Sequence, residues 1–144
     1  MPRRSFFIAA LHVGRGLLAS LFILGGINKI LNHEATALTM SELGFAFVAL
    51  LLPATIALEL GCGMAVAIGR TGAAASAMVL FAYTLVVNLI FHRFWVLHGE
   101  AAQVELSLFF KNVSLAGGML YLAAHGGISS RMPDQSLETS EELT

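Results

Sequence analysis

Hydrophobic and polar positions follow one another along this chain in long blocks. Mostly apolar runs cover about residues 6–30, 45–69, 71–95 and 104–125. A helix that crosses a membrane needs about 20 such residues. The runs are too long and too continuous for the alternating strands of a membrane barrel. The pattern therefore predicts an all-α fold, an antiparallel bundle of four transmembrane helices in a lipid bilayer.

The segments between these runs are short and polar or rich in glycine. They read NHEATALTMSEL, GRTG and VLHGEAAQ, and we expect them to form connections at the level of the lipid headgroups. The end of the chain changes character and becomes polar and acidic. We therefore expect a transmembrane domain over residues 1–128 and a flexible acidic tail over residues 129–144.

The start of the chain, MPRRSFF followed by an apolar run, is similar to a signal peptide. Arg15 interrupts the apolar run and no A-x-A cleavage site follows, so an uncleaved anchor is expected. Arg3, Arg4, Arg70 and Arg131 all fall on one side of a four-span bundle. The positive-inside rule then places both termini in the cytoplasm.

Composition excludes several classes of protein and site. Only 12% of the 144 residues are charged, against about 25% in soluble domains. The net charge is −1 and no basic block is present, which argues against nucleic acid as a partner. The single cysteine, Cys62, excludes an intrachain disulfide and a CxxC redox pair.

Two opposite charges lie inside the first two spans. Ionisable groups at this depth usually face the bundle and find partners. Counted inward from the predicted cytoplasmic ends of their spans, Arg15 and Glu59 each lie about 15 Å deep at 1.5 Å per residue. We therefore predict an intramembrane ion pair between Arg15 and Glu59. It either fixes the register of the two helices or forms the wall of a site or proton path.

A second polar set gathers toward the predicted outer face and indicates a pocket open to the periplasm. Its members are Asn28, Lys29, Asn88, His92, Lys111 and Asn112. These donors suit a small anion or the carbonyl oxygen of a quinone. The alternative is that Lys111 snorkels to the surface, with Glu105 neutralising its charge. His12, His92 and His125 fall on three spans at different depths, so no metal site is expected.

Four pieces of the chain, one from each span, resemble the DoxX family of small bacterial and archaeal membrane proteins. They are RGLLASLFILGGINKI, ELGCGMAVAIG, FHRFW and FFKNVSLAGGML. The resemblance implies a four-helix protein of the bacterial cytoplasmic (inner) membrane. Some members are subunits of a thiosulfate:quinone oxidoreductase, and others are associated with redox-stress enzymes. It also implies that Arg15, Lys29, Glu59, His92, Lys111 and Asn112 are the family's polar positions.

Three functions remain open at this stage. The first is a redox-associated protein that binds quinone or a small anion, as a subunit of a quinone-linked oxidoreductase. The second is a non-catalytic accessory subunit that stabilises a larger membrane complex. The third is a bundle for permeation of small solutes, for which four spans are few unless the protein forms a homo-oligomer. The sequence shows no nucleophile–base pair or phosphate loop that would indicate another enzyme class.

Overall fold

All regular secondary structure in the described residues is helical. The computed structural model describes the backbone of residues 2–129 and the side chains of residues 5–126, so the predicted tail beyond Ser129 lies outside them. The elements are α1 Pro2–Leu31, α2 His33–Glu42, α3 Val48–Ile68, α4 Ala73–Phe91, the 3-10 helix η1 Phe94–Val96, and α5 Gly99–Ser129. Of these, α1, α3, α4 and α5 are long and apolar enough to cross a membrane, which confirms the predicted fold.

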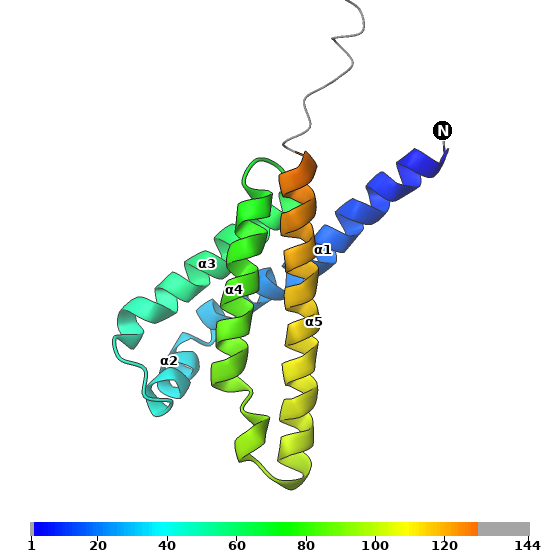
Figure 1. Ribbon diagram of the computed structural model, residues 1–144. Coiled ribbons are helices and arrows are strands. Elements are labelled where there is room, and N and C mark those ends of the chain that lie inside the picture. Colours follow the sequence, from blue (N-terminus) through cyan, green and yellow to red (C-terminus); the bar gives the residue numbers. More distant parts are fainter. Residues whose placement is uncertain (1, 130–144) are drawn as a thin grey trace, which may run out of the picture.

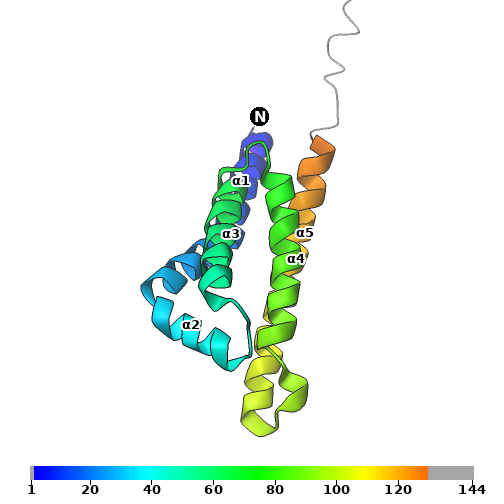
Figure 2. The same ribbon diagram turned by 90° about the vertical axis from the view of Figure 1, so that its left-hand side faces the viewer.

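The helices pack as two pairs that are joined through α3 and α4. Helix α1 packs along α3, and α4 packs along α5. Figure 1 shows α4 and α5 side by side and upright, with α1 crossing behind them at a steep angle. In Figure 2, α2 lies to one side, below the end of α1. We call the end of the bundle that carries α2 and η1 the α2 end, and the end that carries the α3–α4 turn the Arg70 end.

The α3–α4 turn is short because glycine stands at both of its ends. Gly69 ends α3 with φ of 70°, and Gly72 precedes α4 with φ of 93°. Left-handed backbone costs other residues roughly 1–2 kcal/mol, because Cβ then crowds the backbone. The GRTG sequence thus reverses the chain within four residues and sets α3 antiparallel to α4.

Helix α2 lies in the connection that the sequence pattern treated as a loop. It spans ten residues and begins directly after Asn32. The segment contains no glycine or proline before Gly44. The hydroxyl groups of Thr36, Thr39 and Ser41 each donate to the backbone carbonyl four residues earlier, so the helix itself satisfies these three donors. Its lack of an apolar stripe explains why periodicity missed it.

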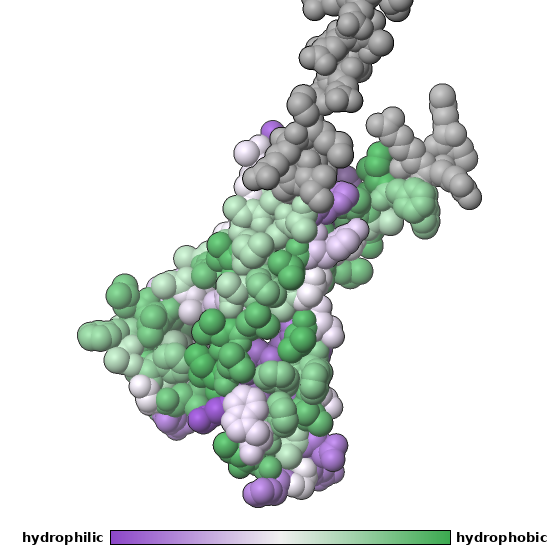
Figure 3. All heavy atoms as spheres, in the orientation of Figure 1, coloured by the Kyte–Doolittle hydropathy of each residue, from purple (hydrophilic) through white to green (hydrophobic). Residues whose placement is uncertain are grey.

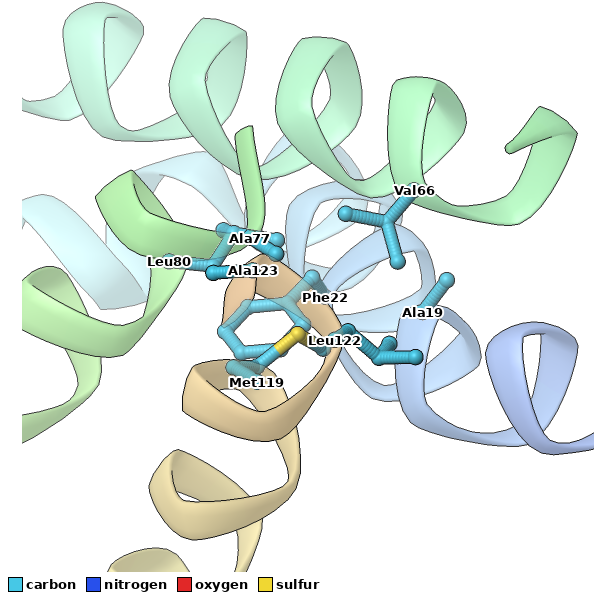
Figure 4. Close-up of a cluster of buried hydrophobic side chains, with 8 residues drawn as sticks. All are labelled: Ala19, Phe22, Val66, Ala77, Leu80, Met119, Leu122 and Ala123. Atoms are coloured by element: carbon cyan, nitrogen blue, oxygen red, sulfur yellow. The ribbon is translucent and has the colours of Figure 1, made fainter. Parts of the chain in front are cut away.

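The hydrophobic core lies where α1 crosses α5, beside α3 and α4. Figure 4 shows its buried side chains, which are Ala19, Phe22, Val66, Ala77, Leu80, Met119, Leu122 and Ala123. Gly118 lets the two crossing helices approach, since a Cβ there would lie 3.0 Å from Leu18. This core holds the two helix pairs together nearer to the Arg70 end than to the α2 end.

The outer surface of the bundle is apolar, as expected for helices in lipid. Figure 3 shows hydrophobic residues over the sides of the helices and hydrophilic residues gathered at the α2 end, at the bottom of the view. The side chains of residues 5–13 are all exposed. Figure 1 shows this first part of α1 projecting away from the bundle, at the upper right. We call it the α1 arm.

Candidate ligand-binding site

A pocket of about 500 Å³ lies between the end of α1, helix α2, the first turns of α3 and the second half of α4. Its walls are mostly apolar, with Leu51 from α3 and Val87 and Ile90 from α4 among them. The polar groups that line it are Asn28, Lys29, Asn32, Thr36, Thr39, Thr55 and Tyr83. Binding sites for small molecules commonly have volumes of about 300–1,000 Å³ and combine apolar walls with a few polar groups.

Three side chains form a compact polar network against this pocket. Lys29 Nζ donates to both carboxylate oxygens of Glu59, at 2.8 Å each. The hydroxyl of Tyr83 donates to Glu59 Oε1 at 2.7 Å. Lys29 and Tyr83 line the pocket, whereas Glu59 does not and is only 5% exposed. The carboxylate is therefore hidden behind its two partners, and the ammonium group offsets its charge.

The packing of α1 against α3 explains why Lys29 reaches Glu59. A Cβ on Gly25 would lie 3.3 Å from Glu59 Oε2, so the missing side chain leaves room for the carboxylate. Residues four apart lie on the same face of a helix. Lys29 is therefore one turn beyond Gly25 on the face that meets α3. Next to it, Gly26 lies so close to Leu60 that a Cβ there would be 2.8 Å away.

The predicted ion pair between Arg15 and Glu59 is wrong. Glu59 pairs with Lys29, and Arg15 donates instead to the backbone carbonyl of Gly69 at 3.2 Å. Arg15 therefore lies level with the end of α3, whereas Glu59 lies ten residues, or about 15 Å, further into that helix. The depth count assumed that both helices start at the same level, but the α1 arm extends beyond the contact with α3.

Asn88, His92 and Asn112 join α4 to α5 and do not line the pocket. Asn88 is 1% exposed; it donates to the carbonyl of Phe109 at 3.1 Å and accepts from Asn112 Nδ2 at 3.0 Å. His92 Nδ1 lies 2.7 Å from Glu105 Oε2. The expectation that these residues share one pocket with Asn28 and Lys29 is therefore not met. Only the two residues from α1 belong to it.

Lys111 does not face inward. Its side chain is exposed on α5, and the described residues provide it with no hydrogen bond or ion pair. Glu105, its proposed neutralising partner, is bonded to His92. The reason is the arrangement of the helices, because α1 meets α5 only around the crossing and leaves this face of α5 uncovered.

Tyr83 was missed by the reasoning from sequence, although a signal was present. Glu59 and Tyr83 stand equally far from Thr71, in the middle of the GRTG turn. In a tight antiparallel hairpin, residues equidistant from the turn lie at the same depth. A phenol inside a span needs a hydrogen-bond partner, so a carboxylate at the same depth on the neighbouring helix is the expected acceptor.

Comparison with known proteins identifies the family of the chain. The DoxX family model matches residues 10–93, which is more than half of the chain. The chain belongs to the DoxX family. All residues that line the pocket of this DoxX protein fall between Asn28 and Phe91, within the matched residues. The match ends at Arg93, before α5, and thus does not include Lys111 or Asn112.

Two inner membrane proteins of Escherichia coli (strain K12) are similar to this DoxX protein over most of its length. It is 33% identical to inner membrane protein YqjF over 117 residues, which cover 79% of this chain and 82% of YqjF. It is 28% identical to inner membrane protein YphA over 116 residues, covering 81% of this chain and 82% of YphA. No solved structure matches the chain significantly.

Proposed function

We propose that this DoxX protein is a redox-associated protein of the bacterial inner membrane. In this proposal it binds a lipophilic molecule of the quinone class in the pocket between α1, α2, α3 and α4. One observation carries the proposal: a mostly apolar pocket of ligand size has the Lys29 ammonium group and the Tyr83 hydroxyl on its wall. The inner-membrane location is supported by the names of the relatives YqjF and YphA.

The residues present fit such a ligand. Ring and isoprenoid carbons would contact the apolar walls formed by Leu51, Val87 and Ile90. An ammonium group has three protons, and the two oxygens of one carboxylate, Glu59, accept one or two of them from Lys29. At least one proton therefore remains for an oxygen of the ligand. A quinone bound here would supply electron and proton transfer, and the protein would hold and orient it for a partner enzyme.

The charge of the network favours a quinone over a small anion. The negative charge of Glu59 offsets the positive charge of Lys29 at 2.8 Å. An anion would have to compete with Glu59 for the same ammonium group, next to a buried negative charge. A neutral carbonyl oxygen can accept the third proton without this repulsion. An uncharged ligand of this kind can also dissolve in the lipid and enter the pocket from there.

The proposal can be tested with a variant that fills the pocket but leaves Lys29, Glu59 and Tyr83 unchanged. Val87→Trp places an indole into the pocket, and Val113→Trp on an exposed face of α5 is the matched control. We expect decylubiquinone to bind the wild type and Val113→Trp in lipid nanodiscs, measured by isothermal titration calorimetry, and to bind Val87→Trp at least tenfold more weakly. Equal affinity of the three proteins, or no binding to the wild type, would refute the proposal.

A second candidate function, an accessory subunit of a larger membrane complex, is favoured by the α1 arm. The side chains of residues 5–13 are all exposed within the described part of the chain. A helix face of this kind is available to another membrane helix. Gentle extraction followed by native mass spectrometry tests this candidate. Stoichiometric partner subunits that are lost when Phe6, Ile8 and Leu11 are changed to alanine would support it, and a partner-free protein would count against it.

A further inference from the structure

We infer that the pocket prefers a ligand hydroxyl to a ligand carbonyl, so that the reduced hydroquinone or a related phenol binds more tightly than the quinone. This inference rests on the proposed binding site and names the form of the ligand that the site recognises. It follows from the directions of the hydrogen bonds in the network of Lys29, Glu59 and Tyr83.

The network fixes which protons remain available to a ligand. Both oxygens of Glu59 accept from the Lys29 ammonium group, so Glu59 acts as an acceptor only. Tyr83 must then donate its single hydroxyl proton to Glu59 Oε1. After these bonds are made, Lys29 has at least one N–H donor left, and the Tyr83 oxygen offers lone pairs but no proton. Because both residues line the pocket, its wall presents a donor and an acceptor side by side.

The donor and the acceptor are close enough to bind one ligand atom. Lys29 Nζ and Tyr83 Oη both lie within 2.8 Å of the same oxygen, Glu59 Oε1, and both line the pocket. A single oxygen at about 2.8 Å from each can therefore bridge them. A hydroxyl accepts from Lys29 and donates to Tyr83. A carbonyl accepts from Lys29 but leaves the Tyr83 oxygen without a donor, and an acceptor left unpaired in an apolar site costs affinity.

The preference is measurable with two pairs of probes. Decylubiquinol and decylubiquinone differ in redox state, while 4-hexylphenol and 4-hexylanisole have the same redox state and differ in that a methyl group replaces the hydroxyl proton. One additional hydrogen bond corresponds to about a 2- to 10-fold difference in affinity. We expect wild-type protein in nanodiscs, titrated anaerobically, to bind decylubiquinol and 4-hexylphenol more tightly than their partners by this factor.

Two variants test whether the preference depends on the Tyr83 oxygen. They are Tyr83→Phe and its control, Tyr121→Phe. Tyr83→Phe removes the acceptor but leaves both bonds between Lys29 and Glu59 in place, so the two members of each pair should bind with equal affinity. Tyr121 is 70% exposed on α5 and outside the pocket, so Tyr121→Phe should keep the wild-type preference. Circular dichroism establishes that both variants fold.

The remaining outcomes each decide against a different claim. Wild-type protein that binds both members of a pair equally, or a preference that persists in Tyr83→Phe, overturns the inference and leaves the proposed pocket intact. Wild-type protein that binds no probe overturns the proposed function itself, and the inference with it. Tighter binding of the quinone than of the hydroquinone by the wild type would also overturn the inference, because it would mean that Tyr83 donates its proton to the ligand instead of to Glu59.

Discussion

Replacing Lys29 by methionine tests the central ion pair of the bundle. Methionine keeps most of the length and apolar surface of the lysine side chain but removes the ammonium group. Glu59 is 5% exposed and would retain only the hydrogen bond from Tyr83. We expect Lys29→Met to be strongly destabilised because a buried carboxylate loses the charge that offsets its own.

The size of the effect follows from the burial of the two partners. Removing one partner of a buried ion pair typically costs about 3–5 kcal/mol. The Lys29 side chain is 26% exposed, so the lower part of this range, about 3 kcal/mol, applies. For a chain of this length each kcal/mol lowers Tm by about 2–4 °C. The expected decrease in Tm is therefore about 6–12 °C. It can be measured by monitoring the fluorescence of Trp95 while both proteins are heated in the same detergent.

Two further variants make this prediction decisive. In the double variant Lys29→Met/Glu59→Gln no charge is left unpaired, so most of the lost stability should return. Arg15→Met removes one bond to a half-buried backbone carbonyl, with an expected cost of about 1 kcal/mol. A decrease for Arg15→Met as large as that for Lys29→Met would contradict the pairing, as would rescue of Arg15→Met by Glu59→Gln.

Three further predictions concern packing, the α4–α5 contact and orientation. Gly26→Ala should cost about 1–3 kcal/mol, because its Cβ would lie 2.8 Å from Leu60, whereas Gly117→Ala, with open space around it, should be neutral or slightly stabilising in the same unfolding assay. Asn88→Ala should cost about 2 kcal/mol and more than Asn112→Ala, because it removes two hydrogen bonds, to the Phe109 carbonyl and from the Asn112 amide, whereas Asn112→Ala removes one; equal Tm values for the two would contradict the buried network. In a Cys62→Ser background, a membrane-impermeant maleimide should label a cysteine at His98 in intact spheroplasts and one at Arg70 only after permeabilisation; the opposite pattern would reverse the predicted orientation.

The fold could be predicted because the length of an apolar run is itself the signal. The four spans follow from runs long enough to cross a bilayer, and the turn between α3 and α4 follows from the two glycines of GRTG. Helix α2 could not be found in this way. Its residues carry no apolar stripe, and its helical form depends on its position across the end of α1 and its contacts with α3.

The site was less predictable because counting residues from the ends of two helices does not show which residues lie side by side. The helices can be offset along their axes. Glu59 was correctly expected to need a cationic partner within the bundle, but the choice between Arg15 and Lys29 depends on how far α1 slides along α3. That register is set by close contacts at Gly25 and Gly26, which periodicity does not reveal. The exposure of Lys111 was unpredictable for a similar reason, because the tilt of α1 decides whether it covers that face of α5.

The position of the pocket along the chain has a consequence for how the protein can be divided. Every residue of its wall lies on one uninterrupted stretch from Asn28 to Phe91, whereas α5 packs against α4, η1 and the middle of α1 without lining the cavity. A cut in the connection between η1 and α5 would leave the whole cavity on one fragment. Two fragments produced together should therefore reassemble through the α4–α5 contact, and ligand capture would report the reassembly.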